Sequence, residues 1–210
     1  MYCILVDMLD ILRNFFDTLL PPHPTILSLR PETPEKFLRL YSTKTFQNCV
    51  TLSSYKQGII KSAIKANKFH NNTHASKLLA KLLEKWLFSL PEKPTVFVSI
   101  PLSSIREKER GYNQVDRILT NLAKLDNCLI KKLLIRKIDT IPQTKMDRGE
   151  RLNNMTNVFA FIEPDIDLQS YRIVLVDDVI TTGATMSSAH KILKENLPAG
   201  TEILCLALAH

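Results

Sequence analysis

The sequence has few cysteines, and none of them are paired by spacing. Cys3, Cys49, Cys128 and Cys205 are scattered along the chain. A disulfide framework or a structural zinc site needs closely spaced ligands, and this pattern supplies neither. The sequence therefore predicts reduced and mostly buried thiols, a cytoplasmic location and no zinc site.

Long apolar runs are also missing. No stretch of roughly 18 uncharged apolar residues occurs, so we expect no membrane span and no membrane partner. The apolar start of the chain is interrupted by Asp7, Asp10, Arg13 and Asp17, and no basic segment precedes it, which argues against a signal peptide. With 45% apolar and 23% charged residues in 210, the composition predicts a soluble globular protein of one domain, or one domain and a small appendage.

The net charge of +7 is concentrated in the middle of the chain. Residues 56–85 contain seven lysines and one glutamate, and residues 103–151 contain twelve basic and seven acidic side chains. Residues 152–210 are acidic, with three basic and seven acidic side chains. This distribution favours a polyanionic ligand, either a phosphorylated metabolite or a nucleic acid. The alternative is that the lysines only solvate the outer faces of helices.

Apolar spacing and proline positions predict the order of elements. The expected helices are 7–20, 57–68, 73–88, 113–124 and 185–196, and the expected strands are 48–55, 96–100, 129–135, 171–176 and 202–208. Residues 21–47, with five of the eleven prolines, and the polar residues 138–155 are expected as loops. In helix 57–68 we expect the lysines to lie opposite Ile60 and Ile64. Strands that alternate with helices predict an α/β fold with a mainly parallel sheet flanked by helices.

The segment 173–185 carries the clearest chemical signal. An apolar strand is followed by two adjacent acids, Asp177 and Asp178, and then by the small-residue loop 181–185, which opens a helix. Ligands of open α/β sheets bind at the carboxyl ends of strands, and free amides at a helix N-terminus suit a phosphate. The loop lacks the lysine of a GxxxxGK motif, which argues against a Walker-type nucleoside triphosphatase. Two carboxylates beside a phosphate cradle suit a sugar phosphate.

This segment resembles, position by position, the 5-phosphoribosyl-1-pyrophosphate (PRPP) signature of type I phosphoribosyltransferases. Further segments resemble the ComF branch of competence proteins, namely 99–102, Arg106, 110–114, Arg136, 142–144, Arg148, 150–151, Asn154 and Phe159. The resemblance covers residues 48–210 and implies the type I phosphoribosyltransferase fold for that domain. Residues 1–47 form a separate N-terminal helix and proline-rich linker in this interpretation, without the zinc ribbon of many relatives.

The resemblance also implies roles for individual residues. Asp177 and Asp178 would act in catalysis and hold the ribose hydroxyls, directly or through Mg²⁺. The other PRPP contacts would come from Val179, Thr181, Thr182, Gly183, Ala184 and Thr185. The pyrophosphate would lie against Leu102, Ser103, Ser104, Arg106 and Arg110. Residues 138–155 resemble a catalytic loop with Lys145, Arg148 and Arg151 as clamps; the alternative is that these cations belong to a solvated loop.

Three functions stay open at this point. The chain can be a phosphoribosyltransferase that uses Mg²⁺ and a nitrogen nucleophile to displace pyrophosphate from PRPP. It can instead be a non-catalytic protein of DNA uptake that binds single-stranded DNA through Lys61, Lys65 and Lys68, with the competence helicase as a further partner implied by the resemblance. It can also be a sensor of PRPP. The acceptor and the oligomeric state are not determined by the sequence.

Overall fold

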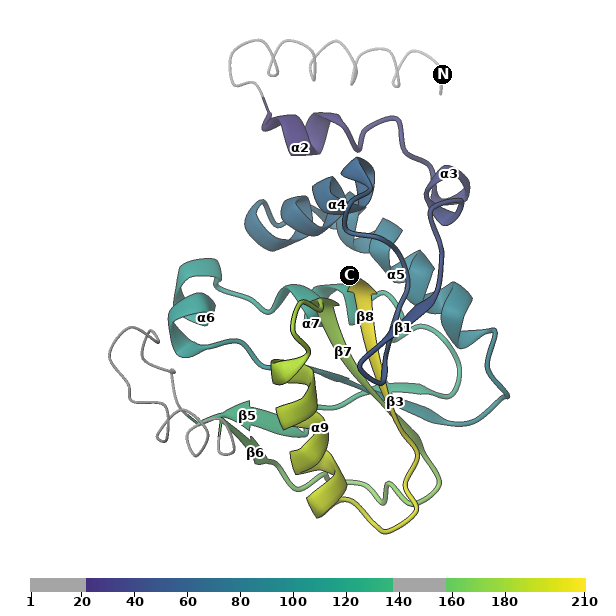
Figure 1. Cartoon of the computed structure of the whole chain (residues 1–210), viewed down its shortest axis with the longest axis vertical. Helices are drawn as coiled ribbons and strands as arrows, with labels where there is room; N and C mark the ends of the chain where they lie inside the picture. Colours follow the sequence, from purple (N-terminus) through teal and green to yellow (C-terminus); the bar gives the residue numbers. More distant parts are fainter. Residues whose placement is uncertain (1–21, 138–157) are drawn as a thin grey trace, which may run out of the picture.

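The structure is a computed structural model that describes residues 22–137 and 158–210. The helix expected at 7–20 and the loop expected at 138–155, with Lys145 and Arg148, lie outside the described residues. The described part is a twisted sheet with helices on both faces (Figure 1).

The main sheet has six strands in the order β1-β2-β8-β7-β3-β4. Their bounds are β1 Lys44–Phe46, β2 Cys49–Thr51, β3 Thr95–Ser99, β4 Cys128–Ile130, β7 Arg172–Val179 and β8 Ile203–Ala209. Every neighbouring pair is parallel except the β1–β2 hairpin. The predicted fold class, α/β with a mainly parallel sheet flanked by helices, is therefore confirmed.

The single strand predicted over 129–135 is wrong. The chain forms β4 there and then β5 (Leu134–Arg136), which pairs with β6 (Phe159–Phe161) in a separate antiparallel ribbon. Lys131 and Lys132 interrupt the apolar run between the two strands, and there the chain leaves one sheet for the other.

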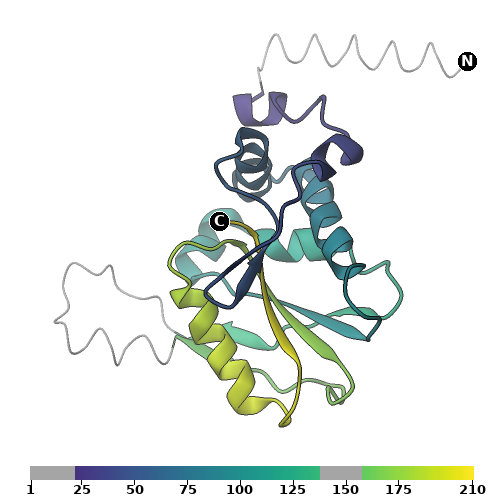
Figure 2. The same ribbon diagram turned by 45° about the vertical axis from the view of Figure 1, so that its right-hand side comes forward.

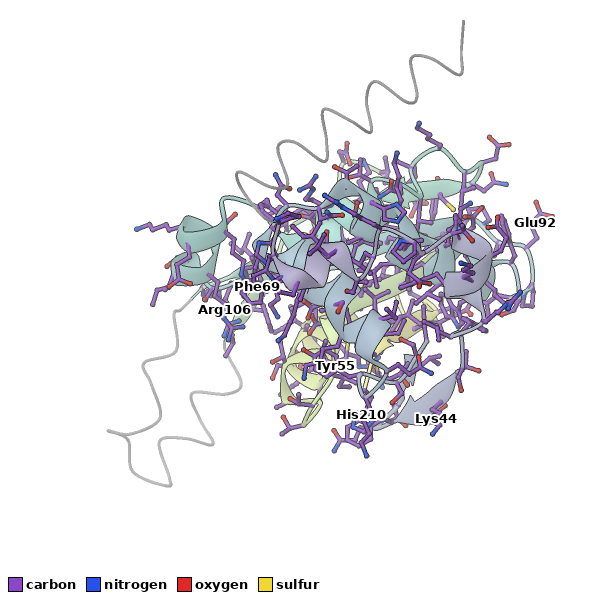
Figure 3. The ribbon with its side chains drawn as sticks, turned by 90° about the horizontal axis from the view of Figure 1, so that it is seen from above. Lys44, Tyr55, Phe69, Glu92, Arg106 and His210 are labelled. Atoms are coloured by element: carbon purple, nitrogen blue, oxygen red, sulfur yellow. The ribbon has the colours of Figure 1, made fainter. Side chains whose placement is uncertain are left out.

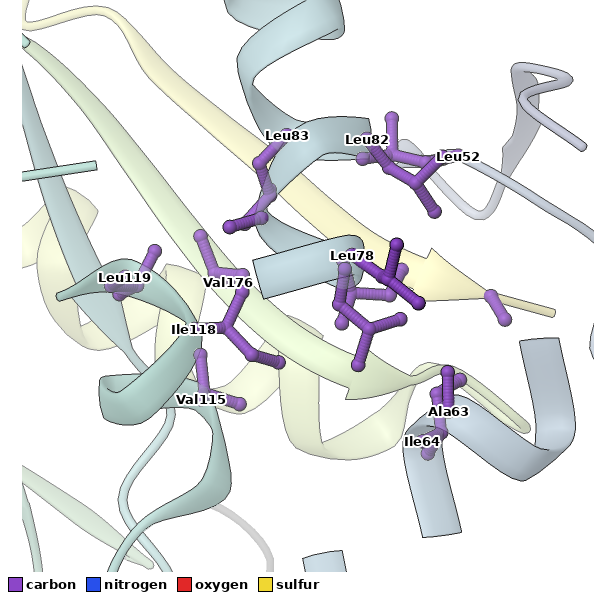
Figure 4. Packing of buried hydrophobic residues seen from close by; sticks show 14 of the residues in the cluster. Leu52, Ala63, Ile64, Leu78, Leu82, Leu83, Val115, Ile118, Leu119 and Val176 are labelled. Carbon is purple, nitrogen blue, oxygen red and sulfur yellow. The ribbon is translucent and has the colours of Figure 1, made fainter. Parts of the chain in front are cut away.

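Each face of the sheet is covered by its own helices. On one face lie α4 (Gly58–Phe69), α5 (Thr73–Leu87) and α7 (Gln114–Leu119), and on the other lies α9 (Ala184–Asn196) (Figure 2). Because side chains alternate along a strand, β7 sends Val174 and Val176 to the first core and Ile173 and Leu175 to the second. Figure 4 shows the first core, in which apolar side chains of α5 and α7 meet β7.

Residues 22–47 contain more structure than the predicted loop. Two short helices, α2 (Pro24–Leu27) and α3 (Pro34–Leu38), both start with proline, which is favoured at the first helical position. Phe37 of α3 is fully buried in the first core, and β1 joins the main sheet through β2. The domain boundary at residue 47 stays a prediction.

Among residues 22–137 and 158–210, no helix is long and apolar enough to cross a bilayer.

Candidate functional site

Asp177 and Asp178 lie at the carboxyl end of β7 and face opposite sides of the sheet. The alternation along β7 continues into this pair, so Asp178 follows Val176 toward α4 and α7, and Asp177 follows Leu175 toward the other face. Asp178 is 5% exposed, whereas Asp177 is partly exposed. The two adjacent carboxylates therefore have different surroundings.

Asp178 is held by two side chains from two helices. Gln114 Nε2, at the start of α7, donates a hydrogen bond of 2.9 Å to Asp178 Oδ2, and Lys68 Nζ of α4 lies 3.3 Å from the same oxygen. A buried carboxylate needs such partners, because an unpaired buried charge is costly. These contacts join α4, α7 and β7 directly beneath the site.

Lys68 does not lie on the face that the sequence predicts for it. Ile60, Ile64 and Lys68 follow one another at intervals of four residues, so all three lie on the inward side of α4. Lys65 lines the same cleft as Lys68, while Lys61 is exposed with its Nζ 5.9 Å from the centre of the Tyr55 ring. The three lysines predicted as one nucleic-acid surface are therefore divided between the cleft and the outside.

Asp177 carries a perturbed carboxyl group. Burial raises its pKa, and the neighbouring charge of Asp178 raises it further, while the backbone N–H of Asp178, Lys68 and Arg106 act in the opposite direction. The N–H of Asp178 donates to Asp177 Oδ1 at 2.8 Å. The net effect is a carboxyl group that takes up a proton more readily than an ordinary aspartate.

The loop after β7 is shaped by Gly183. This residue precedes α9 and has φ of +74°, a left-handed conformation that favours glycine. A Cβ at this position would also collide with the side-chain amide of Gln47, which lies in the β1–β2 turn. Thr181, Thr182 and Thr185 around it are exposed, and the first amides of a helix have no partner within the helix.

A cleft of about 940 Å³ contains both carboxylates and a group of cations. Its charged lining consists of Lys65, Lys68, Arg106, Glu109, Arg136, Asp177 and Asp178. Figure 3 shows Phe69 and Arg106 near each other, and both line this cleft. Phe69 is 61% and Ile105 58% exposed, so two large apolar side chains lie at its mouth.

The residues predicted to bind pyrophosphate are only partly gathered in this cleft. Leu102, Ser103 and Arg106 line it, whereas Ser104 and Arg110 are not among its lining residues. Ser103 caps the helix α6 (Ser104–Arg110) by accepting a hydrogen bond from the N–H of Arg106. This helix was not predicted, because Ile105 is its only apolar residue and gives no periodicity.

The remaining predicted contacts lie along the loop. Thr181, Thr185 and Val179 line the 940 Å³ cleft, and Thr182, Gly183 and Ala184 complete the turn into α9. Val179 and Thr181 also line a second cleft of about 730 Å³.

This second cleft was not predicted from the sequence. It is lined by Ser53, Ser54, Tyr55 and His210, among other residues, and Tyr55, which is labelled in Figure 3, lines both clefts. Its lining comes from β2 and the segment between β2 and α4, and from the ends of β7 and β8, which are far from them in the chain. Only the folded sheet brings them together.

The metal-binding capacity of the site rests on the two carboxylates. Within the described ranges, no cluster of three or more His, Cys, Asp or Glu side chains could hold a metal ion. Mg²⁺ is commonly bound by one or two carboxylates together with substrate oxygens. The partly exposed Asp177 fits this donor set, since it lies in the cleft beside the cations that a polyphosphate needs.

Comparison with known proteins identifies sequence relatives. No family model matches the chain. It is 31% identical over 135 residues to competence protein F of Haemophilus influenzae, covering 61% of this chain and 58% of the relative. It is 30% identical over 145 residues to DNA utilization protein YhgH of Salmonella typhi, covering 66% of this chain and 63% of the relative. Competence protein ComFC of Streptococcus pneumoniae is 32% identical over 130 residues.

These matches are incomplete in length. The chain matches less than two thirds of competence protein F and of the Salmonella YhgH. Among solved structures, adenine phosphoribosyltransferase of Leishmania tarentolae is similar with a TM-score of 0.46 and 17% identity, covering 79% of each chain.

Proposed function

Because this chain belongs to the ComF/YhgH family of competence and DNA utilization proteins, we propose that its 940 Å³ cleft binds PRPP together with Mg²⁺ and that it transfers the phosphoribosyl group. One observation carries the proposal. Asp177 and Asp178 end β7 directly before a glycine-shaped loop that opens α9, and cations of α4 and α6 line the same cleft. Carboxylates, a phosphate loop and cations are the three groups that a ribose bearing phosphates at both ends requires.

Each part of the ligand has a matching part of the site in this proposal. The 5-phosphate binds the hydroxyls and amides of 181–185 at the positive end of α9. The ribose hydroxyls donate to Asp177, with Asp178 behind it. The pyrophosphate lies toward Arg106, Lys68 and the backbone around Ser103.

The reaction is the displacement of pyrophosphate from C1 of the ribose. A nitrogen of the acceptor forms a bond to C1 while the bond from C1 to the pyrophosphate oxygen breaks, and the bonding electrons leave with the pyrophosphate. Positive charge then develops on the sugar and negative charge on the leaving group, so fixed cations near the leaving group lower the barrier. Bound Mg²⁺ supplies further neutralisation of the pyrophosphate oxygens. The acceptor's proton passes to a carboxylate of the cleft.

The proposal is tested by incubating the purified protein with PRPP, Mg²⁺ and a panel of nucleobases and amines, and by measuring pyrophosphate release. Titration calorimetry with PRPP and Mg²⁺ measures binding separately. Binding with release supports a transferase, and binding without release from any acceptor supports a PRPP sensor. Absence of PRPP binding at millimolar concentration contradicts the proposal.

A second candidate function is binding of single-stranded DNA, and the exposed ring of Phe69 favours it. Aromatic rings beside cations are the usual platform for unpaired bases, and Phe69 lies next to Lys65 and Lys68 on α4. A fluorescent oligonucleotide should then bind with an affinity that falls as salt rises, and Phe69→Ala should weaken it. Phe88→Ala, at a second exposed phenylalanine, is the matched control. Equal effects of the two changes would contradict this function, and the same assay can be repeated with the competence helicase as a partner.

A further inference from the structure

The segment Arg110–Gln114 joins α6 to α7, and its side chains contact separate parts of the site. Asn113 Nδ2 donates to the carbonyl of Ile100, in the loop after β3, at 2.9 Å. Asn113 Oδ1 accepts from the N–H of Val115 and so caps α7. This one side chain therefore fixes the start of α7 against the loop after β3, which lines the cleft.

Tyr112 and Gln114 connect the same segment to α4. The Tyr112 hydroxyl donates to the carbonyl of Asn67 at 2.6 Å and accepts from the N–H of Asn71 at 3.1 Å. Asn67 Nδ2 in turn donates to the backbone carbonyl of Gln114 at 2.8 Å. Lys68, the ionic partner of Asp178, directly follows Asn67, so these bonds also set the position of that lysine.

The orientation of the Gln114 amide is decided by Arg110. Arg110 Nη1 donates to Gln114 Oε1 at 2.9 Å, which leaves Gln114 Nε2 facing Asp178 Oδ2 at 2.9 Å. If the amide turned over, its oxygen would face the carboxylate and its nitrogen would face the guanidinium, and both contacts would be repulsive. The hydrogen-bonded chain from Arg110 through Gln114 to Asp178 therefore has a single favourable arrangement.

Arg110 is occupied by the protein itself. Its guanidinium lies 5.3 Å from the centre of the Phe69 ring, and the residue is not among those that line the cleft. Burial lowers its pKa, while Asp178 acts in the opposite direction. An arginine held on one side by an amide and on the other by an aromatic ring is fixed for packing and orientation rather than for ligand contact.

We propose that Arg110 and Gln114 are positioning residues that hold the Asp178 carboxylate in place, with Arg110 acting through Gln114 and not on the ligand. The identity of the ligand rests on the proposed function, but the positioning itself does not. The inference assigns a role to Gln114 and gives Arg110 a role other than the pyrophosphate contact predicted for it.

The first test uses the ligand-free protein. Hydrogen exchange of side-chain amide protons, measured by NMR, should be slow for Gln114 and fast for the exposed Gln169. In Arg110→Met, exchange at Gln114 should become at least about tenfold faster, because one of two hydrogen bonds to a charged group is lost. Lys108→Met, an exposed change of the same kind on α6, should leave it unaltered. Unchanged exchange in Arg110→Met would overturn the proposal.

The second test compares PRPP affinity in single and double variants. Arg110→Met and Gln114→Leu should each weaken Mg²⁺-dependent PRPP binding by about tenfold or more, and the double variant should be no weaker than either single one. Arg110→Lys, which keeps one donor to Gln114, should recover part of the affinity. The thermal midpoint is measured in parallel, so that loss of fold is recognised.

The outcomes separate the two claims. Additive losses in the double variant would mean that Arg110 contacts the ligand directly, which overturns the positioning role. If the wild-type protein binds no PRPP, the proposed function is wrong, and the exchange measurement alone then decides whether Arg110 orients Gln114.

Discussion

Asp177 and Asp178 are identical residues whose folded environments differ, and this difference predicts opposite effects of the same substitution. Because the pKa of Asp177 is raised in the folded protein, ionisation of this carboxyl group destabilises the fold. The destabilisation grows as the pH rises from about 4, the ordinary pKa of an aspartate, to the raised pKa. We expect Asp177→Asn to raise the free energy of unfolding at pH 7 and to weaken Mg²⁺–PRPP binding.

Asp178→Asn should act in the other direction. In this variant the mostly buried Lys68 loses its counter-ion, while Gln114 keeps a hydrogen-bond acceptor. We therefore expect the free energy of unfolding to fall by about 1–3 kcal/mol. Urea unfolding at pH 7 measures both changes. Equal stability changes in the two variants would contradict the assignment of their environments.

Gly183 predicts a second effect at the level of one residue. Gly183→Ala and Gly200→Ala should cost similar stability, because both residues have positive φ, at +74° and +87°, and the atom nearest a new Cβ at position 183 is the end of the exposed Gln47 side chain, which can turn away. We expect about 1 kcal/mol for each change, from the backbone conformation alone.

The Gln47 side chain provides the control for this prediction. In a Gln47→Ala background the contact is absent, and the cost of Gly183→Ala should stay close to that of Gly200→Ala. Thermal unfolding of the five proteins measures the differences. A cost that falls clearly in the Gln47→Ala background would show instead that the Gln47 side chain cannot turn away.

At the scale of elements, the end of the sheet opposite the site, where β3, β7 and β8 begin, is held together by charged side chains. Glu202, before β8, accepts from Arg172 Nε at 3.0 Å and from Lys93 Nζ at 3.1 Å. Burial alone would raise the pKa of Glu202, but the hydrogen bonds from Lys93 and Arg172 outweigh it and lower the pKa. These contacts join the starts of β3, β7 and β8.

The lowered pKa fixes the sign of the pH dependence. The stabilisation by Glu202 is complete above the ordinary glutamate pKa of about 4.3 and is lost as the pH falls through the lowered folded value. Glu202→Gln should therefore reduce stability by about 0.5–1 kcal/mol at pH 7, since the pair is partly exposed, and by less as the pH falls below the ordinary value. Glu195→Gln, on the exposed side of α9, is the control. If the difference in free energy of unfolding between Glu202→Gln and the wild-type protein stayed constant from pH 7 to pH 3, the prediction would be contradicted.

The long elements could be predicted from the sequence, and the short ones could not. Periodicity and apolar runs locate α4, α5, α9, β7 and β8 within a few residues. The three-residue strands β1 and β6 and the charged helix α6 are too short or too polar to show a period, and neighbours far away in the chain determine them. The same holds for Lys68, whose inward direction follows from the spacing to Ile60 and Ile64 but whose partner, Asp178, is 110 residues further along the chain.

At the scale of the whole molecule, Phe37 tests whether residues 22–47 unfold with the rest. Its side chain is fully buried in the core formed with α4 and α5. We expect Phe37→Ala to cost about 3–5 kcal/mol and to lower the midpoint of a single cooperative transition. Calorimetry measures this, with Phe88→Ala, at an exposed position, as the control. A separate early transition in Phe37→Ala would support an independent N-terminal unit.

The candidate site could be predicted only where one segment supplies it. Residues 173–185 contain both carboxylates and the phosphate loop, so their local sequence carries the signal. The partners of these residues come from α4, from the turn at Gln47 and from Gln114, and their approach is a property of the assembled sheet. The residues that do the chemistry were therefore easier to predict than those that hold them.

The packing of α5 has a practical consequence for spectroscopy. Trp86, the only tryptophan of the chain, is 4% exposed in the first core and lines neither of the two clefts beside β7. Its fluorescence should report the loss of the core on unfolding and remain nearly constant when the clefts are filled. The intact protein thus carries an intrinsic optical probe of its folding that is separate from its ligand chemistry.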